Sequence, residues 1–185
     1  MLKTILLFLK HPIYEEDANT DFQYRSKVLF TLLGIGLVAS IILGALNEGI
    51  QSLFKLDLGV HAIKESLDKY SPGYLFFLFV IVAPLFEELI CRGPMFFFKN
   101  KRYFKYVFYI LTLLFGFYHI TNFEINSTTA LLSPLLVAPQ LSLGAILGFI
   151  RVRFGLWWAI ALHAIYNCIL IGPILVLQLL DISLE

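Results

Sequence analysis

Two adjacent glutamates lie inside a long apolar stretch, where charged residues are rare. Glu87 and Glu88 stand in LFEELICRGP (85–94), with apolar sequence on both sides. A carboxylate in hydrocarbon costs about 2.5–3.5 kcal/mol on insertion scales, and such residues usually have a function. Arg92 follows Glu88 by four positions, so the two can pair along one helix face. Glu87 points about 100° away from Glu88 and is left free for another task.

Two histidines and an asparagine stand in other apolar stretches. His119 ends FGFYH, and His163 and Asn167 are four apart in HAIYN, so one helix can present both. Counted from the nearest basic residues at ~1.5 Å per residue, these side chains and Glu87 lie roughly 15–21 Å deep. That depth is near the middle of a hydrocarbon core about 30 Å thick. A shared depth on three helices predicts one polar site.

These residue types can activate a water for hydrolysis, for example of a peptide bond. The reaction needs an activated water, a stabiliser for the oxyanion and a proton for the leaving amine. Glu87 can act as the base, and His119 can share the water or move the proton. His163 and Asn167 can donate N–H groups to the oxyanion.

The same side chains also allow a metal-dependent version of this chemistry. Glu87, His119 and His163 would form a His₂Glu set with an open position for water, as in catalytic zinc sites. The residues leave both versions open, so no cofactor is certain and a divalent metal such as zinc is the alternative.

The composition predicts the elements that must carry this site. Of the 185 residues, 59% are hydrophobic and only 15% are charged, and the mean hydropathy is +0.82. A soluble domain would carry more charge. We therefore predict an all-α, polytopic transmembrane helix bundle that forms a single integral membrane domain over residues 1–185. The net charge of +1 gives no indication of a nucleic-acid partner; the expected partners are the lipid bilayer and a peptide or protein substrate.

Five apolar segments predict about five spans, at 28–46, 74–98, 106–121, 130–150 and 154–177. The motif-bearing core is 74–177. Residues 1–27 are expected to form an interfacial N-terminal arm, and LDLGVHAIKESLDKY (56–70) can form an amphipathic helix on the membrane surface. Pro84 removes a backbone donor and could kink its helix, leaving a carbonyl for water to satisfy.

Basic residues gather before the first span, between the second and third, and between the fourth and fifth. They are Arg25, Lys27, Lys99, Lys101, Arg102, Lys105, Arg151 and Arg153. The positive-inside rule then places the N-terminus in the cytoplasm and the C-terminus outside, and we expect the plasma membrane as the location. A water-filled cavity lined by the second, third and fifth spans should admit the substrate, with the fourth span beside it as a wall or gate.

The polar motifs also follow a known order. EELICR (87–92), FGFYH (115–119) and HAIYN (163–167) match EExxxR, FxxxH and HxxxN. This order resembles the CPBP family (CAAX proteases and bacteriocin-processing enzymes, also called ABI), which includes the type II CAAX prenyl endopeptidase. The resemblance implies an intramembrane endopeptidase acting on a membrane-associated or lipidated protein or peptide. It implies catalytic roles for Glu87, His119, His163 and Asn167, and supporting roles for Glu88, Arg92 and Phe115.

Two other classes of function stay open. A catalytically silent bacteriocin-immunity or scaffold protein of the same fold should have lost some site residues, whereas here every motif position is filled. A proton-coupled carrier could relay protons through the same cluster, although the chain has no repeated pair of broken helices of the kind typical of carriers.

Overall fold

The computed structural model describes residues 1–56, 58, 62–180 and 182, and this part of the chain is helical with no strand. In chain order the elements are α1 (Leu2–Lys10), α2 (Phe22–Phe54), α3 (Ala62–Lys69), α4 (Pro72–Phe76), the π-helix η1 (Phe77–Val82), α5 (Ala83–Cys91), the 3₁₀ helix η2 (Gly93–Phe98), α6 (Phe104–Tyr118), the 3₁₀ helix η3 (His119–Asn122), α7 (Ser127–Leu136), α8 (Ala138–Phe154) and α9 (Leu156–Leu179).

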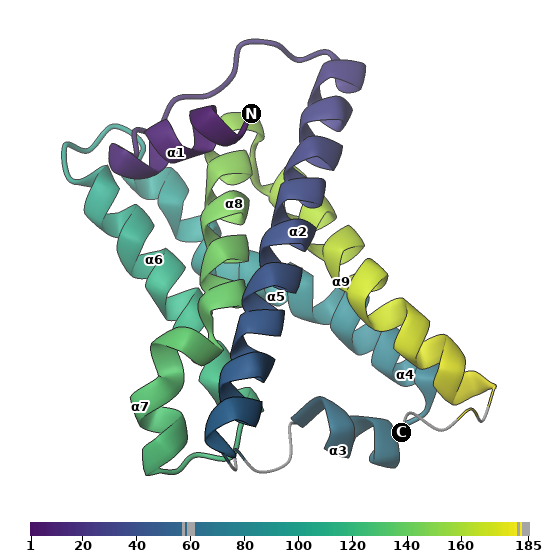
Figure 1. Cartoon of the computed structure of the whole chain (residues 1–185). Helices are drawn as coiled ribbons and strands as arrows, with labels where there is room; N and C mark the ends of the chain where they lie inside the picture. Colours follow the sequence, from purple (N-terminus) through teal and green to yellow (C-terminus); the bar gives the residue numbers. More distant parts are fainter. Residues whose placement is uncertain (57, 59–61, 181, 183–185) are drawn as a thin grey trace.

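Four helical stretches of the described chain are long and apolar enough to cross a membrane. They are Phe22–Phe54, Pro72–Phe98, Phe104–Asn122 and Leu156–Leu179. Helices α7 and α8 are bent by 40° at Val137 and together can make a fifth. These helices run between the two ends of the bundle (Figure 1). The prediction of an all-α bundle with about five spans is confirmed.

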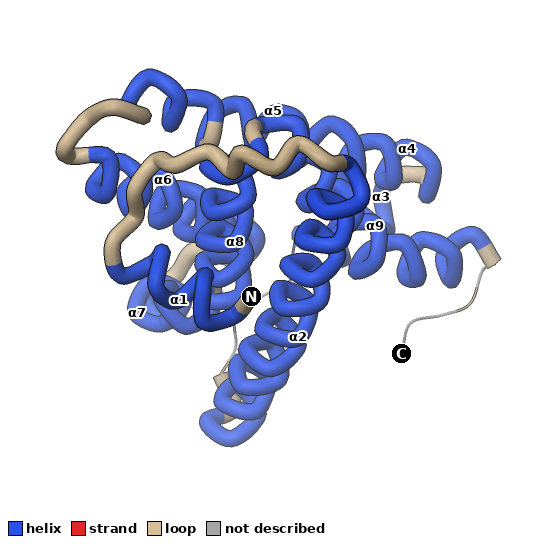
Figure 2. Tube along the Cα trace, turned by 90° about the horizontal axis from the view of Figure 1, so that it is seen from above, coloured by secondary structure: helices blue, strands red, loops and turns tan. Residues whose placement is uncertain are grey.

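Helix α8 lies at the centre of this bundle and packs against α2, α6 and α9. Seen from above, it lies between α6 and α2 (Figure 2). Small residues permit this position, because a Cβ at Gly144 or Gly148 would press on the rings of Phe115 and Phe108 of α6. The fourth span, predicted to lie beside the substrate cavity as a wall or gate, packs tightly on three neighbours through these glycines.

The N-terminal arm covers one end of the bundle. The Phe8 ring of α1 meets Phe108 at 5.1 Å and Phe149 at 5.2 Å, edge to face. The Tyr109 hydroxyl donates to the Leu9 carbonyl at 2.7 Å. Residues 22–27, assigned from the sequence to the arm, form the first turns of α2. The start of α2, the loop before α6 and the end of α8 all lie at this end (Figure 1), so the three basic clusters share it.

The opposite end carries the short helix α3. The Gln178 side chain of α9 donates to the carbonyls of Leu67 at 2.7 Å and Tyr70 at 3.1 Å, which ties α3 to the end of α9. The amphipathic helix expected within 56–70 therefore forms at Ala62–Lys69. Residues 57 and 59–61 of that segment lie outside the described residues.

Candidate active site

A π-helical segment immediately precedes the glutamates. In η1 the Ala83 N–H donates to the Leu78 carbonyl, five residues back. The next bond of this register would run from residue 84 to Phe79, but Pro84 has no N–H. The Asn167 side chain of α9 donates to the Phe79 carbonyl at 2.9 Å instead. The carbonyl that Pro84 leaves free thus has a side-chain donor within the protein, which the sequence reasoning did not identify.

Glu88 is fully buried and accepts two hydrogen bonds. Arg92 Nη1 donates to Glu88 Oε1 at 3.0 Å, which confirms the predicted pair within one helix. His163 Nδ1 on α9 donates to the same oxygen at 3.0 Å, and only 3% of the His163 side chain is exposed. Because a carboxylate only accepts hydrogen bonds, Nδ1 carries a proton. Glu88 therefore fixes the direction of the His163 ring.

The Phe115 ring contacts Arg92 and both histidines. The Arg92 guanidinium lies 3.9 Å from the ring centre, in a cation–π contact, and Nη2 donates to the Gly144 carbonyl at 3.2 Å. The same ring lies 5.0 Å from the His119 ring and 5.7 Å from the His163 ring. Phe115, which is 2% exposed, therefore supports three polar side chains at once.

Glycine 144 is a part of this site that the sequence reasoning did not identify. A Cβ there would lie 2.9 Å from a ring carbon of Phe115 and 3.3 Å from Arg92 Nη2. Only glycine leaves room for Arg92 to reach the carbonyl of α8. A small residue in the middle of an apolar span is a general signal of close helix packing, but it does not name the partner.

Glu87 faces the opposite ring nitrogens of the two histidines. Its Oε2 lies 3.9 Å from His163 Nε2 and 4.0 Å from His119 Nε2. His119 Nδ1 donates to the Phe115 carbonyl at 2.8 Å, which turns Nε2 of that ring toward Glu87 as well. Glu87 is 25% exposed, in contrast to the buried Glu88. The structure thus brings the side chains of Glu87, His119 and His163 together at one depth in the bundle. Asn167 lies one helical turn farther along α9.

A groove of about 510 Å³ between α5 and α6 reaches Glu87. Its lining residues are Val82, Ala83, Phe86, Glu87, Ile90, Cys91, Leu111, Leu114, Phe115 and Tyr118. The second and third spans line it as predicted, but the fifth does not, because His163 is buried against Glu88. Glu87 is the one acidic or basic residue of the lining.

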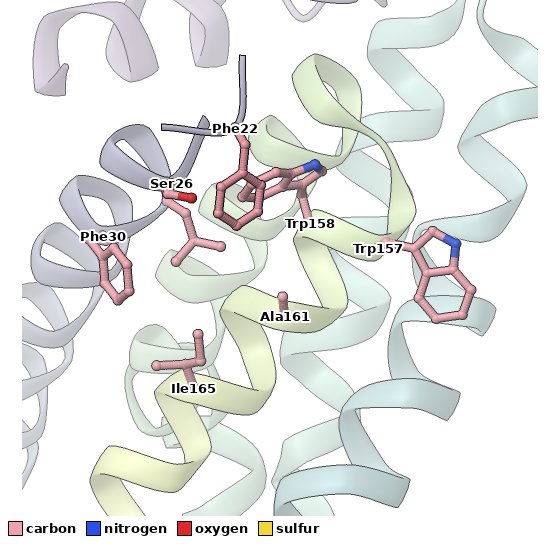
Figure 3. Close-up of a pocket in the computed structure, with 8 residues that line it drawn as sticks. Phe22, Ser26, Phe30, Trp157, Trp158, Ala161 and Ile165 are labelled. Carbon is pink, nitrogen blue, oxygen red and sulfur yellow. The ribbon is translucent and has the colours of Figure 1, made fainter. Parts of the chain in front are cut away.

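A second groove, of about 330 Å³, lies between α2 and α9 (Figure 3). It is lined by Phe22, Ser26, Leu29, Phe30, Trp157, Trp158, Ala161 and Ile165. None of these side chains is an acid or a base, so this groove does not compete as a site of hydrolysis.

The donor types at Glu87, His119 and His163 suit zinc, but their placement does not. In the part of the chain that the structure describes, no three His, Cys, Asp or Glu side chains are arranged to hold a metal ion. Bonds of about 2.0–2.1 Å in a tetrahedral site put ligand atoms roughly 3.3 Å apart. The distances from Glu87 to the two histidines are longer, at 3.9 and 4.0 Å. The zinc alternative stays a prediction.

Comparison with known protein families finds a match over the part of the chain that carries this site. Neither the curated proteins nor the solved structures contain a match to the chain. The family model described as type II CAAX prenyl endopeptidase Rce1-like matches residues 70–169, which include every residue of the candidate site and more than half of the chain. Together with the apolar helices, this membrane-protease family indicates an integral membrane protein. The chain therefore belongs to the Rce1-like family of type II CAAX prenyl endopeptidases.

Proposed function

We propose that this protein hydrolyses a peptide bond of a lipidated, membrane-associated protein or peptide, with Glu87 as the base that activates water. The observation that carries this proposal is the position of the Glu87 carboxylate, 3.9 and 4.0 Å from the Nε2 atoms of His163 and His119. These distances are too long for direct hydrogen bonds and suit one bridging water. Membership of a protease family supports the same chemistry.

In this mechanism each side chain has one task. Glu87 takes a proton from the bridging water while the water oxygen attacks the substrate carbonyl carbon. His163 Nε2, protonated while Nδ1 donates to Glu88, donates to the resulting oxyanion. The proton on Glu87 then passes through His119 to the amine nitrogen, the C–N bond breaks, and a carboxylic acid and an amine leave.

The groove between α5 and α6 supplies the route to Glu87. Its lining is almost entirely apolar, so a lipid-attached or hydrophobic segment can lie in it with the scissile bond at the inner wall. The description of the matched family names prenylated CAAX substrates, and we propose the same class for this chain.

The test uses the full chain in lipid nanodiscs and a fluorogenic farnesylated CAAX peptide, with the unfarnesylated peptide for comparison. Glu87→Gln should lower turnover by about 10²–10⁴-fold, the usual contribution of a general base. Glu48→Gln, which changes an exposed carboxylate on α2, is the matched control and should keep the wild-type rate. Wild-type cleavage by Glu87→Gln would contradict the assignment.

The same assay tests whether cleavage of the peptide requires a bound metal ion. We expect full turnover after treatment with 1,10-phenanthroline and no stoichiometric metal in the purified protein. Loss of turnover in chelator, together with about one zinc ion per chain, would favour the His₂Glu alternative instead.

A further inference from the structure

A chain of hydrogen bonds joins the N-terminal arm to the proposed active site. Arg151 Nη1 donates to the Tyr14 hydroxyl at 2.9 Å, and Arg151 Nε donates to the backbone carbonyl of Arg92 at 3.1 Å. Arg92 continues through its side chain to Glu88, which accepts from His163. The path crosses from the arm to α8, then to the end of α5, and finally to α9.

Arg151 is the central member of this path and is not a surface charge. The sequence placed it among the basic residues between the fourth and fifth spans, yet it lies within the last turn of α8 and is 6% exposed. A buried guanidinium needs polar partners. The Arg92 carbonyl, where α5 gives way to η2, accepts from the Met95 N–H at 3.3 Å and from Arg151 Nε at 3.1 Å.

We propose that Tyr14 and Arg151 are positioning residues for the proposed hydrolysis. They hold the end of α5 so that Glu88 keeps the His163 ring directed at Glu87. This inference rests on the proposed function. Geometry at this site matters, because a displacement of about 1 Å in a catalytic group can cost on the order of 10²-fold in rate.

Tyr14 connects the N-terminal arm to the proposed active site through Arg151. It lies between α1 and α2, outside the residues 70–169 that match the family model. Its ring packs edge to face on Phe104 at 5.4 Å, and its hydroxyl accepts from Arg151. Tyr14→Phe therefore removes the hydrogen bond and keeps the ring contact.

Arg153 offers a matched control. It also contacts the arm, through Nη1 to the Glu15 carbonyl at 3.3 Å, and its own carbonyl accepts from the Asp17 N–H at 2.9 Å. Its side chain is 29% exposed and its described contacts go to the arm, not to α5. Arg153→Lys thus perturbs the attachment of the arm without touching the path to Glu88.

The first measurement is steady-state cleavage of the farnesylated peptide. Arg151→Lys should lower kcat by about tenfold and Tyr14→Phe by about threefold, with KM within about twofold of wild type, as expected when a hydrogen bond that orients the site is lost. The double variant should be no slower than Arg151→Lys, because both changes break one path. An unchanged kcat for Arg151→Lys, or an equal loss for Arg153→Lys, would overturn the inference.

The second measurement needs no activity. Cys91 precedes Arg92 and lines the groove, and Cys168→Ser leaves it as the single cysteine. Arg151→Lys should raise the rate of Cys91 alkylation by N-ethylmaleimide about threefold or more, as the end of α5 loosens, while Arg153→Lys should not. An unchanged rate would overturn the positioning role even in an active enzyme. If Arg151→Lys raises the rate of Cys91 alkylation but the wild-type protein cleaves no peptide, the contact of Arg151 with α5 is supported and the proposed function is refuted.

Discussion

Two neighbouring glutamates of α5 have opposite surroundings. Glu88 is fully buried between Arg92 and His163 and accepts from both. Glu87 is 25% exposed, lines the groove and directs one oxygen at two imidazole nitrogens. Glu88 is thus held by two buried partners, and Glu87 is the carboxylate on the groove.

This contrast predicts different effects on stability. Glu88→Gln should lower the free energy of unfolding by about 3 kcal/mol, because the Arg92 guanidinium loses its counter-charge in a buried position. Glu87→Gln should lower it by less than about 1 kcal/mol, because its carboxylate has no close ion pair. Reversible unfolding in mixed micelles measures both. Equal losses for the two variants would contradict the division of roles.

Close approach between α6 and α8 depends on Gly144. A methyl group there would push Phe115 away from α8 and strain its contact with Arg92. Gly144→Ala should destabilise the bundle by about 1–3 kcal/mol and slow cleavage. Gly34→Ala is the control, because nothing lies within 4 Å of its added Cβ on α2. That variant should gain up to about 1 kcal/mol from helix propensity, and a loss like that of Gly144→Ala would refute the packing argument.

The π segment of the second span depends on a side chain from α9. Asn167→Leu should cost about 1–3 kcal/mol, because the Phe79 carbonyl loses its donor in an apolar environment. Pro84→Ala should recover most of this loss, because the new N–H can reach the Phe79 carbonyl. The free energies of unfolding of the single and double variants measure this recovery. A double variant no more stable than Asn167→Leu would contradict the hydrogen-bond register proposed for η1.

Activity of the recovered double variant tests the other role predicted for Asn167. If the amide also donates to the oxyanion, the stable double variant should still cleave the farnesylated peptide about 10²–10³-fold more slowly than Pro84→Ala alone. Turnover equal to that of Pro84→Ala would restrict Asn167 to holding η1 against α9.

The whole bundle has one basic end. The start of α2, the segment between η2 and α6 and the end of α8 gather there (Figure 1), and the positive-inside rule predicts that this end is cytoplasmic. Cysteines at Lys101 and Asn126, in a chain with Cys91 and Cys168 replaced by serine, test the prediction. A membrane-impermeant maleimide on intact cells should label position 126 and not 101. The reverse pattern would invert the orientation and leave the site unchanged.

The residue types and their order along the chain were sufficient to predict the spans, one ion pair, the depth of the site and the family. The spans follow from long apolar runs, and the Glu88–Arg92 pair follows from their spacing of four, because both depend on segments of a few turns. The shared depth of Glu87, His119 and His163 follows from counting along each helix. The three motifs in order predicted the family that the comparison confirmed.

Only the tertiary structure decided which faces of the helices meet. The bonds of Glu88 to His163, Arg92 to Gly144, Asn167 to Phe79 and Arg151 to Tyr14 join residues 52 to 137 positions apart. Apolarity all around each helix suits a bilayer but leaves its rotation undetermined, because lipid tails solvate every face equally well. Close contacts at small residues and a few buried polar bonds select the rotation. These contacts place α8 at the centre, bury Arg151 and turn both histidines toward Glu87.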